Sequence, residues 1–190
     1  MATRGRDKFH KVKPILNILS VLYSVFPLKT RKKLLEFHRG TKGLKGLAIR
    51  YALIKAIAKK CGDNVSIHTD CYLFSPEKLE IGDNVSIHPM CYIDAAGGIS
   101  IGNDVSIAHA ATIMTSTHNF DRYDIPIKDQ QCSVEKTIIG DNVWIGAKAT
   151  ILCGTNVGSG SVIGATSVVT KNTQENTVNV GVPARRIKER

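Results

Sequence analysis

Between Cys61 and Val169 the chain places an aliphatic side chain, or cysteine in the first case, at every sixth position, in blocks of three. These positions are Cys61, Ile67 and Leu73; Ile81, Ile87 and Ile93; Ile101, Ile107 and Ile113; Ile139, Ile145 and Ile151; and Val157, Ile163 and Val169. An α-helix repeats every 3.6 residues and a strand every two, so neither produces a spacing of six. Triplets of six-residue repeats are typical of a β-solenoid with three flat faces and one coil per triplet.

Four of the five predicted coils open on a nearly identical pentapeptide. The four copies are Cys61-Gly62-Asp63-Asn64-Val65, Ile81-Gly82-Asp83-Asn84-Val85, Ile101-Gly102-Asn103-Asp104-Val105 and Ile139-Gly140-Asp141-Asn142-Val143. Gly, Asp and Asn tolerate the backbone of a tight corner, and the Val that follows returns to the core. The pentapeptides therefore mark the corners at which successive coils begin.

The repeat is interrupted between residues 118 and 137. The positions that would continue it are Asn119, Ile125 and Gln131, and the segment is rich in Asp, Lys and Arg. We therefore expect a polar loop that protrudes from the solenoid instead of another coil. A long loop on a rigid scaffold is usually functional.

A second inward position of the repeat holds small side chains. Cys71 and Cys91 occupy it in neighbouring coils, and elsewhere it holds Val65, Val85, Val105, Ala111, Val143 and Ala149. The two thiols are therefore expected to stack in the core, about 4.8 Å apart. Five cysteines without a CxxC pair favour a reduced, cytoplasmic protein over a disulfide framework.

Residues 1–60 form a strongly basic extension. They contain 16 Lys and Arg against Asp7 and Glu36, a net charge of +14, whereas residues 61–190 carry a net charge of −4. After a basic start at residues 1–13, helices are predicted from Pro14 to Phe26 and from about Leu47 to Lys60. The first helix has one polar stripe, formed by Asn17, Ser20 and Ser24, on an otherwise apolar cylinder.

Two interpretations of this extension stay open. The helices could pack their apolar faces on the end of the solenoid, or a basic interfacial helix could contact an anionic membrane surface peripherally, at the inner membrane. Pro27 stands where a signal peptide would have small residues for cleavage, and no apolar stretch approaches the roughly 20 residues of a membrane span. Nucleic acid is disfavoured as a partner because a binding motif and aromatic stacking residues are missing.

Several segments stand in a characteristic order along the solenoid. A Ser/Thr-rich segment ends in His118, the loop follows, and Val143-Trp144-Ile145-Gly146 and Gly181-Val182-Pro183-Ala184-Arg185 come after it. In this order the chain resembles the left-handed β-helix acyltransferases of the maltose/galactoside O-acetyltransferase type. Within that type it is most similar to those that acetylate sugars of bacterial capsular or surface polysaccharides. The resemblance covers roughly residues 61–190.

The resemblance has implications for fold, reaction and assembly. It implies a left-handed parallel β-helix of about five coils, which departs from the usual right-handed crossover. It also implies acetyl-CoA as the donor, a sugar or polysaccharide precursor as the acceptor, and a homotrimer with active sites between subunits. The expected organisation is a basic helical extension (residues 1–60), a β-helix domain (61–171) with its loop at 118–137, and a basic C-terminal segment (172–190).

His118 is the predicted catalytic base, because it aligns with the catalytic histidine of the family. Imidazole is the side chain suited to accept a hydroxyl proton near pH 7. The resulting alkoxide would attack the thioester directly, without a covalent enzyme intermediate. Asp94 and Glu135 are both considered as the group that orients His118, and the sequence does not decide between them.

The resemblance assigns the donor side to one tryptophan and to small and basic residues near the C-terminus. They are Trp144, Gly146, Ala147, Gly164, Ala165, Thr170, Lys171, Arg185 and Lys188, with Arg186 as a weaker candidate. The small residues would let the CoA arm lie against the backbone, and the cations would match its phosphates. The alternatives are a surface or interface tryptophan and a solvated basic tail.

His88 and Asp94 are assigned to the acceptor side, with an exposed surface as the alternative. Asp94 is followed by Ala95 and Ala96, where the maltose/galactoside pattern has adjacent acidic residues. The resemblance to the family therefore does not identify the acceptor sugar of this chain. It also does not say whether that sugar is free, nucleotide-linked or lipid-linked. A sugar N-acetyltransferase, an antibiotic acetyltransferase and a non-catalytic trimeric scaffold stay open as alternatives.

No metal site is predicted. The γ-class carbonic anhydrases share the fold and bind zinc through three histidines, two of them five residues apart. Here His88, His109 and His118 are separated by twenty-one and nine residues, which does not fit that pattern. His68 and His88 occupy the same position in neighbouring coils and are expected to stack on one face.

Overall fold

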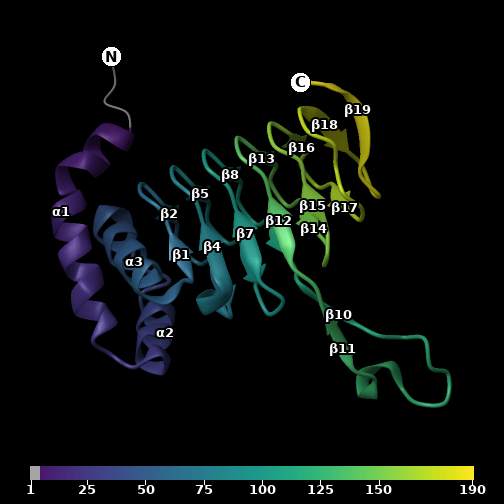
Figure 1. Ribbon diagram of the computed structural model, residues 1–190, viewed down its shortest axis with the longest axis horizontal. Helices are drawn as coiled ribbons and strands as arrows, with labels where there is room; N and C mark the ends of the chain where they lie inside the picture. The colour runs from purple at the N-terminus through teal and green to yellow at the C-terminus, as the bar shows by residue number, and fades with distance from the viewer. Residues whose placement is uncertain (1–4) are drawn as a thin grey trace.

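The computed structural model describes residues 5–190, and most of it is a three-faced solenoid with helices at one end (Figure 1). Sheet A contains β1 (Lys60–Cys61), β4 (Leu79–Ile81), β7 (Ile99–Ile101), β12 (Thr137–Ile139) and β15 (Asn156–Val157). Sheet B contains β2 (Ser66–Ile67), β5 (Ser86–Ile87), β8 (Ser106–Ile107), β13 (Trp144–Ile145), β16 (Val162–Ile163), β18 (Thr177–Val180) and β19 (Arg185–Glu189). Sheet C contains β3 (Tyr72–Phe74), β6 (Tyr92–Asp94), β9 (Thr112–Ile113), β14 (Thr150–Ile151) and β17 (Val168–Val169). All neighbouring strands in these sheets are parallel except β18 and β19, so the predicted β-solenoid is confirmed.

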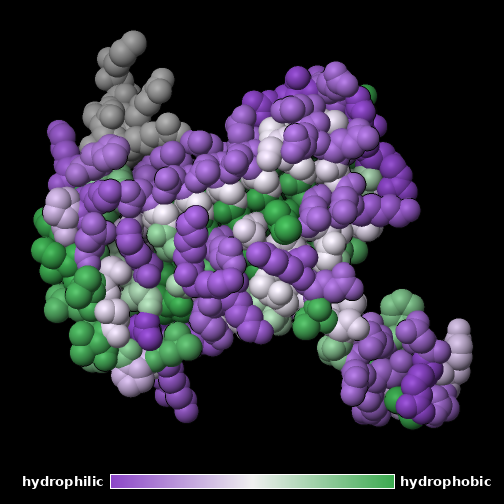
Figure 2. Space-filling view, viewed as in Figure 1, coloured by the Kyte–Doolittle hydropathy of each residue, from purple (hydrophilic) through white to green (hydrophobic). Residues whose placement is uncertain are grey.

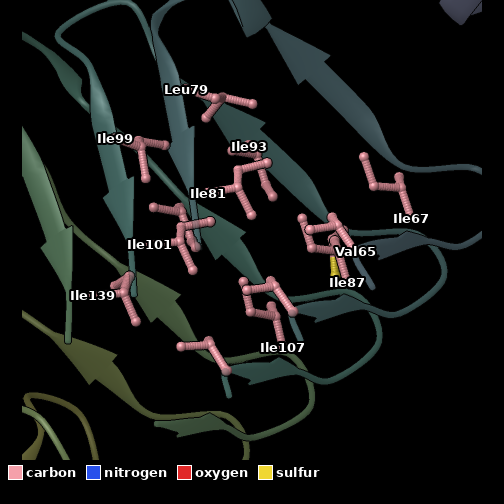
Figure 3. Close-up of a cluster of buried hydrophobic side chains, with 14 of the residues drawn as sticks. Val65, Ile67, Leu79, Ile81, Ile87, Ile93, Ile99, Ile101, Ile107 and Ile139 are labelled. Atoms are coloured by element: carbon pink, nitrogen blue, oxygen red, sulfur yellow. The ribbon is translucent and has the colours of Figure 1, made fainter. Parts of the chain in front are cut away.

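The coils stack in register because each repeat position pairs with its equivalent in the next coil. In sheet B, Ile67 pairs with Ile87, and Ile87 pairs with Ile107. The repeat side chains point into the solenoid and are buried, apart from Cys61 and Leu73 in the first coil. Figure 3 shows those of the first coils lying one above another in a single continuous core.

The predicted inward position for small residues is also buried. This holds for the six Val and Ala residues and for both stacked thiols, Cys71 and Cys91. All five cysteines of the chain are free thiols.

The corner pentapeptides adopt the tight turn that their composition predicts. Asn64, Asn84, Asp104 and Asn142 have φ values of 53°, 58°, 57° and 54°, in the left-handed region that Asn and Asp tolerate best. The Val that follows each of them is buried. The corner is therefore set by local backbone chemistry, repeated once per coil.

The predicted excursion from the solenoid is present as a protruding hairpin (Figure 1). After β9 the chain forms β10 (Ser116–His118), a connection with a short 3₁₀ turn at Ile127–Asp129, and β11 (Cys132–Val134). The two strands are antiparallel, and the chain then re-enters sheet A at β12. The hairpin therefore leaves the solenoid at the corner between sheets C and A.

Three helices precede the solenoid: α1 (Gly5–Ser24), α2 (Leu28–Phe37) and α3 (Gly43–Ile57). The predicted helix start at Pro14 is wrong, because Pro14 lies inside α1. Proline removes one backbone hydrogen bond, to the carbonyl of His10, and His10 is exposed, so water can replace that bond. α2 was not predicted. Its sequence is dominated by basic residues, and the apolar pair Leu34 and Leu35 is too short to show a helical period. No helix within residues 5–190 is long and apolar enough to cross a membrane.

The helices are layered on the first coil. α3 contacts β1 and β2, and α1 and α2 pack on α3, so α1 forms the outermost layer at this end (Figure 1). Arg50 of α3 is 2% exposed and joins the layers. Its Nε donates to the carbonyl of Ile67 at 2.7 Å, and its Nη1 donates to the carbonyls of Thr41 (2.7 Å) and His38 (3.0 Å).

Candidate active site

His118 lies exposed on β10, where the hairpin leaves the solenoid. The hairpin register places Cys132 of β11 directly opposite, with its Sγ 3.5 Å from His118 Nδ1. The next residue along, Asn119, is held by a hydrogen bond of 2.7 Å from the Ser133 hydroxyl to its Oδ1. The imidazole is therefore accessible, while the backbone that presents it is fixed by strand pairing.

Asp94 ties the base of the hairpin to sheet C. Its Oδ2 accepts a hydrogen bond of 2.5 Å from the Ser116 hydroxyl, and its Oδ1 accepts one of 3.0 Å from the backbone of Ala96. The buried Thr115 hydroxyl donates to the Asp94 carbonyl at 2.8 Å. Asp94 thus fixes the segment two residues before His118, and the polar contacts of its carboxylate lead to Ser116 and Ala96.

Glu135, the second residue considered as an orienting partner, follows β11, where the hairpin returns to the solenoid. Its backbone N–H donates to the carbonyl of Thr115 at 3.0 Å. Its carboxylate lies over Gly154, where an added Cβ would be 2.2 Å from Glu135 Oε2. These contacts give Glu135 a place in the packing between the hairpin and the solenoid.

The small residues predicted for the donor side stack one above another at the corner between sheets B and C. The backbone N–H of Thr166 donates to the carbonyl of Ala147 at 2.8 Å. A Cβ at Gly146 would be 2.5 Å from the backbone nitrogen of Ala165, so this glycine is required for the close approach of the two coils. Ala165 is exposed, and Trp144, on the strand that leads into this corner, is 55% exposed.

The basic residues predicted for the donor side lie on the last coils, with Lys171 after β17 at the corner between sheets C and A and Arg185 opposite Val180 in sheet B. Thr170 and Lys171 follow β17 and are exposed, as are Arg185 and Lys188 on β19. The segment before β19 is joined to β17, because the backbone N–H of Ala184 donates to the carbonyl of Val168 at 2.8 Å. Three cations therefore project from the same C-terminal coils.

Arg186 differs from these cations in its contacts. Its Nη1 donates to Gln174 Oε1 at 2.7 Å, and its Nη2 lies 2.8 Å from Glu189 Oε1. The Arg186 guanidinium is thus already engaged by two neighbouring side chains.

His88 lies on the same column as the small donor-side residues, at the corner between sheets B and C. It stacks on His68 as predicted, with ring centroids 5.0 Å apart and an interplanar angle of 11°. Burial, and after it the neighbouring imidazole of His88, lowers the pKa of His68, which favours the uncharged form of the His68 ring in the stack. His88 and Asp94 are at opposite edges of sheet C, so one chain does not bring the two predicted acceptor residues together.

The predicted site is thus divided between two corners of one chain. The base corner (Asp94, Ser116 and His118) lies between sheets C and A. The donor corner (Trp144, Gly146, Ala147, Gly164 and Ala165) lies between sheets B and C. A cavity of about 490 Å³ between α2 and the first coil includes none of the predicted site residues. Among residues 5–190, no group of three or more His, Cys, Asp or Glu side chains could hold a metal ion.

Ser116, Thr115 and Cys132 were not predicted as neighbours of the candidate site residues. Ser116 and Thr115 are visible as part of the Ser/Thr-rich segment, but their contact with Asp94 depends on the stacking of coils. Cys132 lies 14 residues after His118, and only the register of the hairpin brings the two together. No motif in the sequence fixes that register.

Residues 136–171 match the family model described as bacterial transferase hexapeptide (six repeats). The chain is 33% identical over 148 residues to the galactoside O-acetyltransferase of Escherichia coli K12, which covers 74% of this chain and 68% of that enzyme. The chain belongs to the hexapeptide-repeat acetyltransferases. The predicted family and its left-handed parallel β-helix are thereby confirmed.

Other hexapeptide-repeat acetyltransferases match over shorter or comparable ranges. A putative lipopolysaccharide biosynthesis O-acetyl transferase of E. coli K12 is 44% identical over 66 residues, 35% of this chain, and the chain spans about a third (34%) of that relative. The galactoside acetyltransferase solved with coenzyme A has a TM-score of 0.76 at 30% identity, covering 84% of this chain and 78% of that one. A Vibrio cholerae hexapeptide-repeat acetyltransferase solved with acetyl-coenzyme A has a TM-score of 0.77 at 25% identity, covering 85% and 86%.

Proposed function

We propose that the protein transfers the acetyl group of acetyl-CoA to a hydroxyl of a sugar or polysaccharide precursor. The observation that carries this proposal is the position of His118, an exposed imidazole held by strand pairing at the edge of the solenoid. Relatives named for galactoside and lipopolysaccharide O-acetylation support a carbohydrate acceptor. Solved relatives that contain coenzyme A or acetyl-coenzyme A support the donor.

His118 acts as the general base and then as the general acid. It takes the proton of the acceptor hydroxyl while that oxygen attacks the thioester carbonyl carbon. The C–O bond forms, the C–S bond breaks, and His118 returns the proton to the departing sulfur. The products are the acetyl ester and free CoA, and no group of the protein is acylated.

The donor corner and the C-terminal cations bind acetyl-CoA. Ala165 and Trp144 offer an exposed, mainly apolar surface for the acyl arm. Lys171, Arg185 and Lys188 project near the same coils and suit the phosphates of the nucleotide end. Gly146 and Gly164 let neighbouring coils stack closely beneath this surface. A Cβ at Gly146 would be 2.5 Å from Ala165 N, and a Cβ at Gly164 would be 2.7 Å from Val180 Cγ1.

A homotrimer completes the site in this proposal. The hairpin with His118 projects away from the solenoid of its own chain (Figure 1), and the donor corner lies across sheet C. A neighbouring subunit would bring its donor corner to the hairpin. We further propose that the enzyme works in the cytoplasm, where acetyl-CoA and sugar precursors are available.

Release of CoA from acetyl-CoA across a panel of sugars, nucleotide sugars and amino sugars tests the proposed reaction. Acceptor-dependent release with formation of an ester product is expected. If only amino sugars react and the product is an amide, the acceptor class is wrong and the enzyme is an N-acetyltransferase. No release with any acceptor, together with no acetyl-CoA binding by calorimetry, would favour the non-catalytic scaffold.

Removal of two donor-side cations is expected to weaken acetyl-CoA binding. The double variant Lys171→Gln, Arg185→Gln loses two phosphate ligands, so the KM for acetyl-CoA should rise about tenfold or more with a small change in kcat. Arg186→Gln is the matched control, because Arg186 is paired with Gln174 and Glu189. Steady-state kinetics at saturating acceptor would measure both, and equal KM values for the two variants would contradict the assignment.

A further inference from the structure

Helix α1 buries only part of its apolar surface and leaves an apolar side facing outward. Ser20, from the polar stripe, is buried together with Phe9 and Leu16 on the side that packs on α3. Asn17 is half-buried, and its Oδ1 is buried without a hydrogen-bond partner. An amphipathic helix of a soluble protein normally buries its apolar side. α1 therefore packs one part of its apolar surface, with Phe9, Leu16 and Tyr23, on the protein and leaves a second apolar side uncovered.

The outward side of α1 is a continuous apolar stripe. Its members are Ile15, Ile18, Val21, Leu22 and Val25, each between 57% and 79% exposed. Their spacing of three and four residues places them on one face of the helix. Phe26 and Leu28 extend the exposed apolar surface beyond the helix end. In Figure 2 hydrophobic residues gather at this end of the molecule, over α1 and α2.

Basic side chains border the stripe. Lys29 and Lys33, at the start of α2, are exposed. Lys13 is the one charged residue between residues 12 and 26, and its Nζ lies 2.5 Å from Asp63 Oδ2, on the side away from the stripe. The hydrogen bond from Lys13 lowers the pKa of Asp63 and fixes α1 on the first coil. The stripe is therefore uncharged along its length and has two exposed lysines at its border.

We propose that this apolar stripe docks α1 in the plane of an anionic lipid membrane. A helix with exposed aliphatic side chains and a basic border buries the former at the headgroup boundary and places the latter among anionic headgroups. A second copy of the same surface would bring two clusters of lysines together, whereas anionic lipid neutralises them. The charge therefore selects the membrane over self-association.

The position of α1 in the fold fits this role. α1 is the outermost layer at one end of the molecule, and β18 and β19 form the opposite end (Figure 1). Docking through α1 leaves the hairpin and the C-terminal coils free. The enzyme would then act beside the surface on which lipid-linked glycans are assembled.

Flotation of the full-length protein with lipid vesicles tests the proposed docking. The assay needs neither acetyl-CoA nor an acceptor, so a negative result would count against the docking and not against the proposed reaction. The protein should float with vesicles of phosphatidylcholine and phosphatidylglycerol, and less at high salt. The variant Ile18→Glu, Leu22→Glu should bind at least about tenfold less, because two acidic side chains replace the centre of the stripe. Circular dichroism would verify that it is folded.

Ile187→Glu is the matched control. Ile187 is 59% exposed on β19, similar to Ile18, but lies at the opposite end of the molecule. It should float like the wild type. Equal flotation of the stripe variant and the wild type, no flotation of the wild type, or equal binding to pure phosphatidylcholine would each overturn the proposal. A stripe variant with a lower molar mass in solution than the wild type would assign the stripe to a second copy and overturn it as well.

Discussion

The variant His118→Ala is expected to lower kcat/KM for acetyl transfer by roughly 10²–10⁴-fold, the range that a positioned general base contributes. The corresponding increase in the activation free energy is about 3–5 kcal/mol. Acetyl-CoA binding should be retained, because the donor corner and the C-terminal cations do not include His118. Steady-state CoA release and calorimetric titration with acetyl-CoA would separate the two effects.

The hairpin offers a control for the His118 experiment. Lys128, at the far end of the hairpin, is exposed and pairs with its neighbour Asp129 at 2.8 Å. Lys128→Ala removes a charge from the same excursion without touching the β10–β11 pairing, and its activity should stay close to that of the wild type. A His118→Ala enzyme with activity within about tenfold of the wild type would rule out His118 as the base.

The solenoid could be predicted from the sequence because its physics is local and repeated. Each coil has the same corner chemistry, and Asn64, Asn84 and Asn142 show that it produces the same left-handed backbone each time. Each repeat aliphatic meets its own equivalent in the next coil, so a period in the sequence becomes a column in the core. One residue that departs from the repeat, such as Cys61 at an aliphatic position, does not obscure the period of the pattern.

The helices were less predictable because they occur once and depend on what they contact. The apolar positions of α1 indicate a helix, but not which side faces the protein. Leu16 and Ser20 are buried and Ile18 is exposed, so the apolar positions of the helix divide between the protein side and the outer side. α1 also continues through Pro14, since the bond that proline removes is at a solvated position. The apolar period in the sequence therefore identifies the helix. It does not show whether an apolar side of that helix contacts the rest of the protein or another apolar environment.

The sequence proposes the site residues one by one, but it does not give their arrangement. His118 follows from its place at the end of the last regular coil before the interruption. Its neighbour Cys132 follows only from the hairpin register, and the contact of Ser116 with Asp94 follows only from the stacking of β6 beside β9. Sequence motifs thus name the groups, while strand pairing decides which of them meet.

The division of the site between two corners leads to the second strong prediction. His118 and the donor corner are separated by sheet C within one chain, so the two halves must come from different subunits if they act together. Cyclic symmetry gives every subunit one copy of each half and pairs the base corner of one with the donor corner of the next. A defect in either corner then disables a site without damaging the other half of the same chain.

Two inactive variants should therefore restore activity when they assemble together. Ala165→Trp fills the exposed donor corner and should abolish acetyl-CoA binding, while His118→Ala keeps it. Random trimers of the two, obtained by co-expression with different tags, should have about a quarter of the wild-type activity, since a complete site needs one intact half from each of two neighbours. Co-expression of His118→Ala with His118→Asn is the matched control and should restore none. Mixed oligomers without activity, or a solution mass near 20.7 kDa by light scattering, would place both halves of the site in one chain.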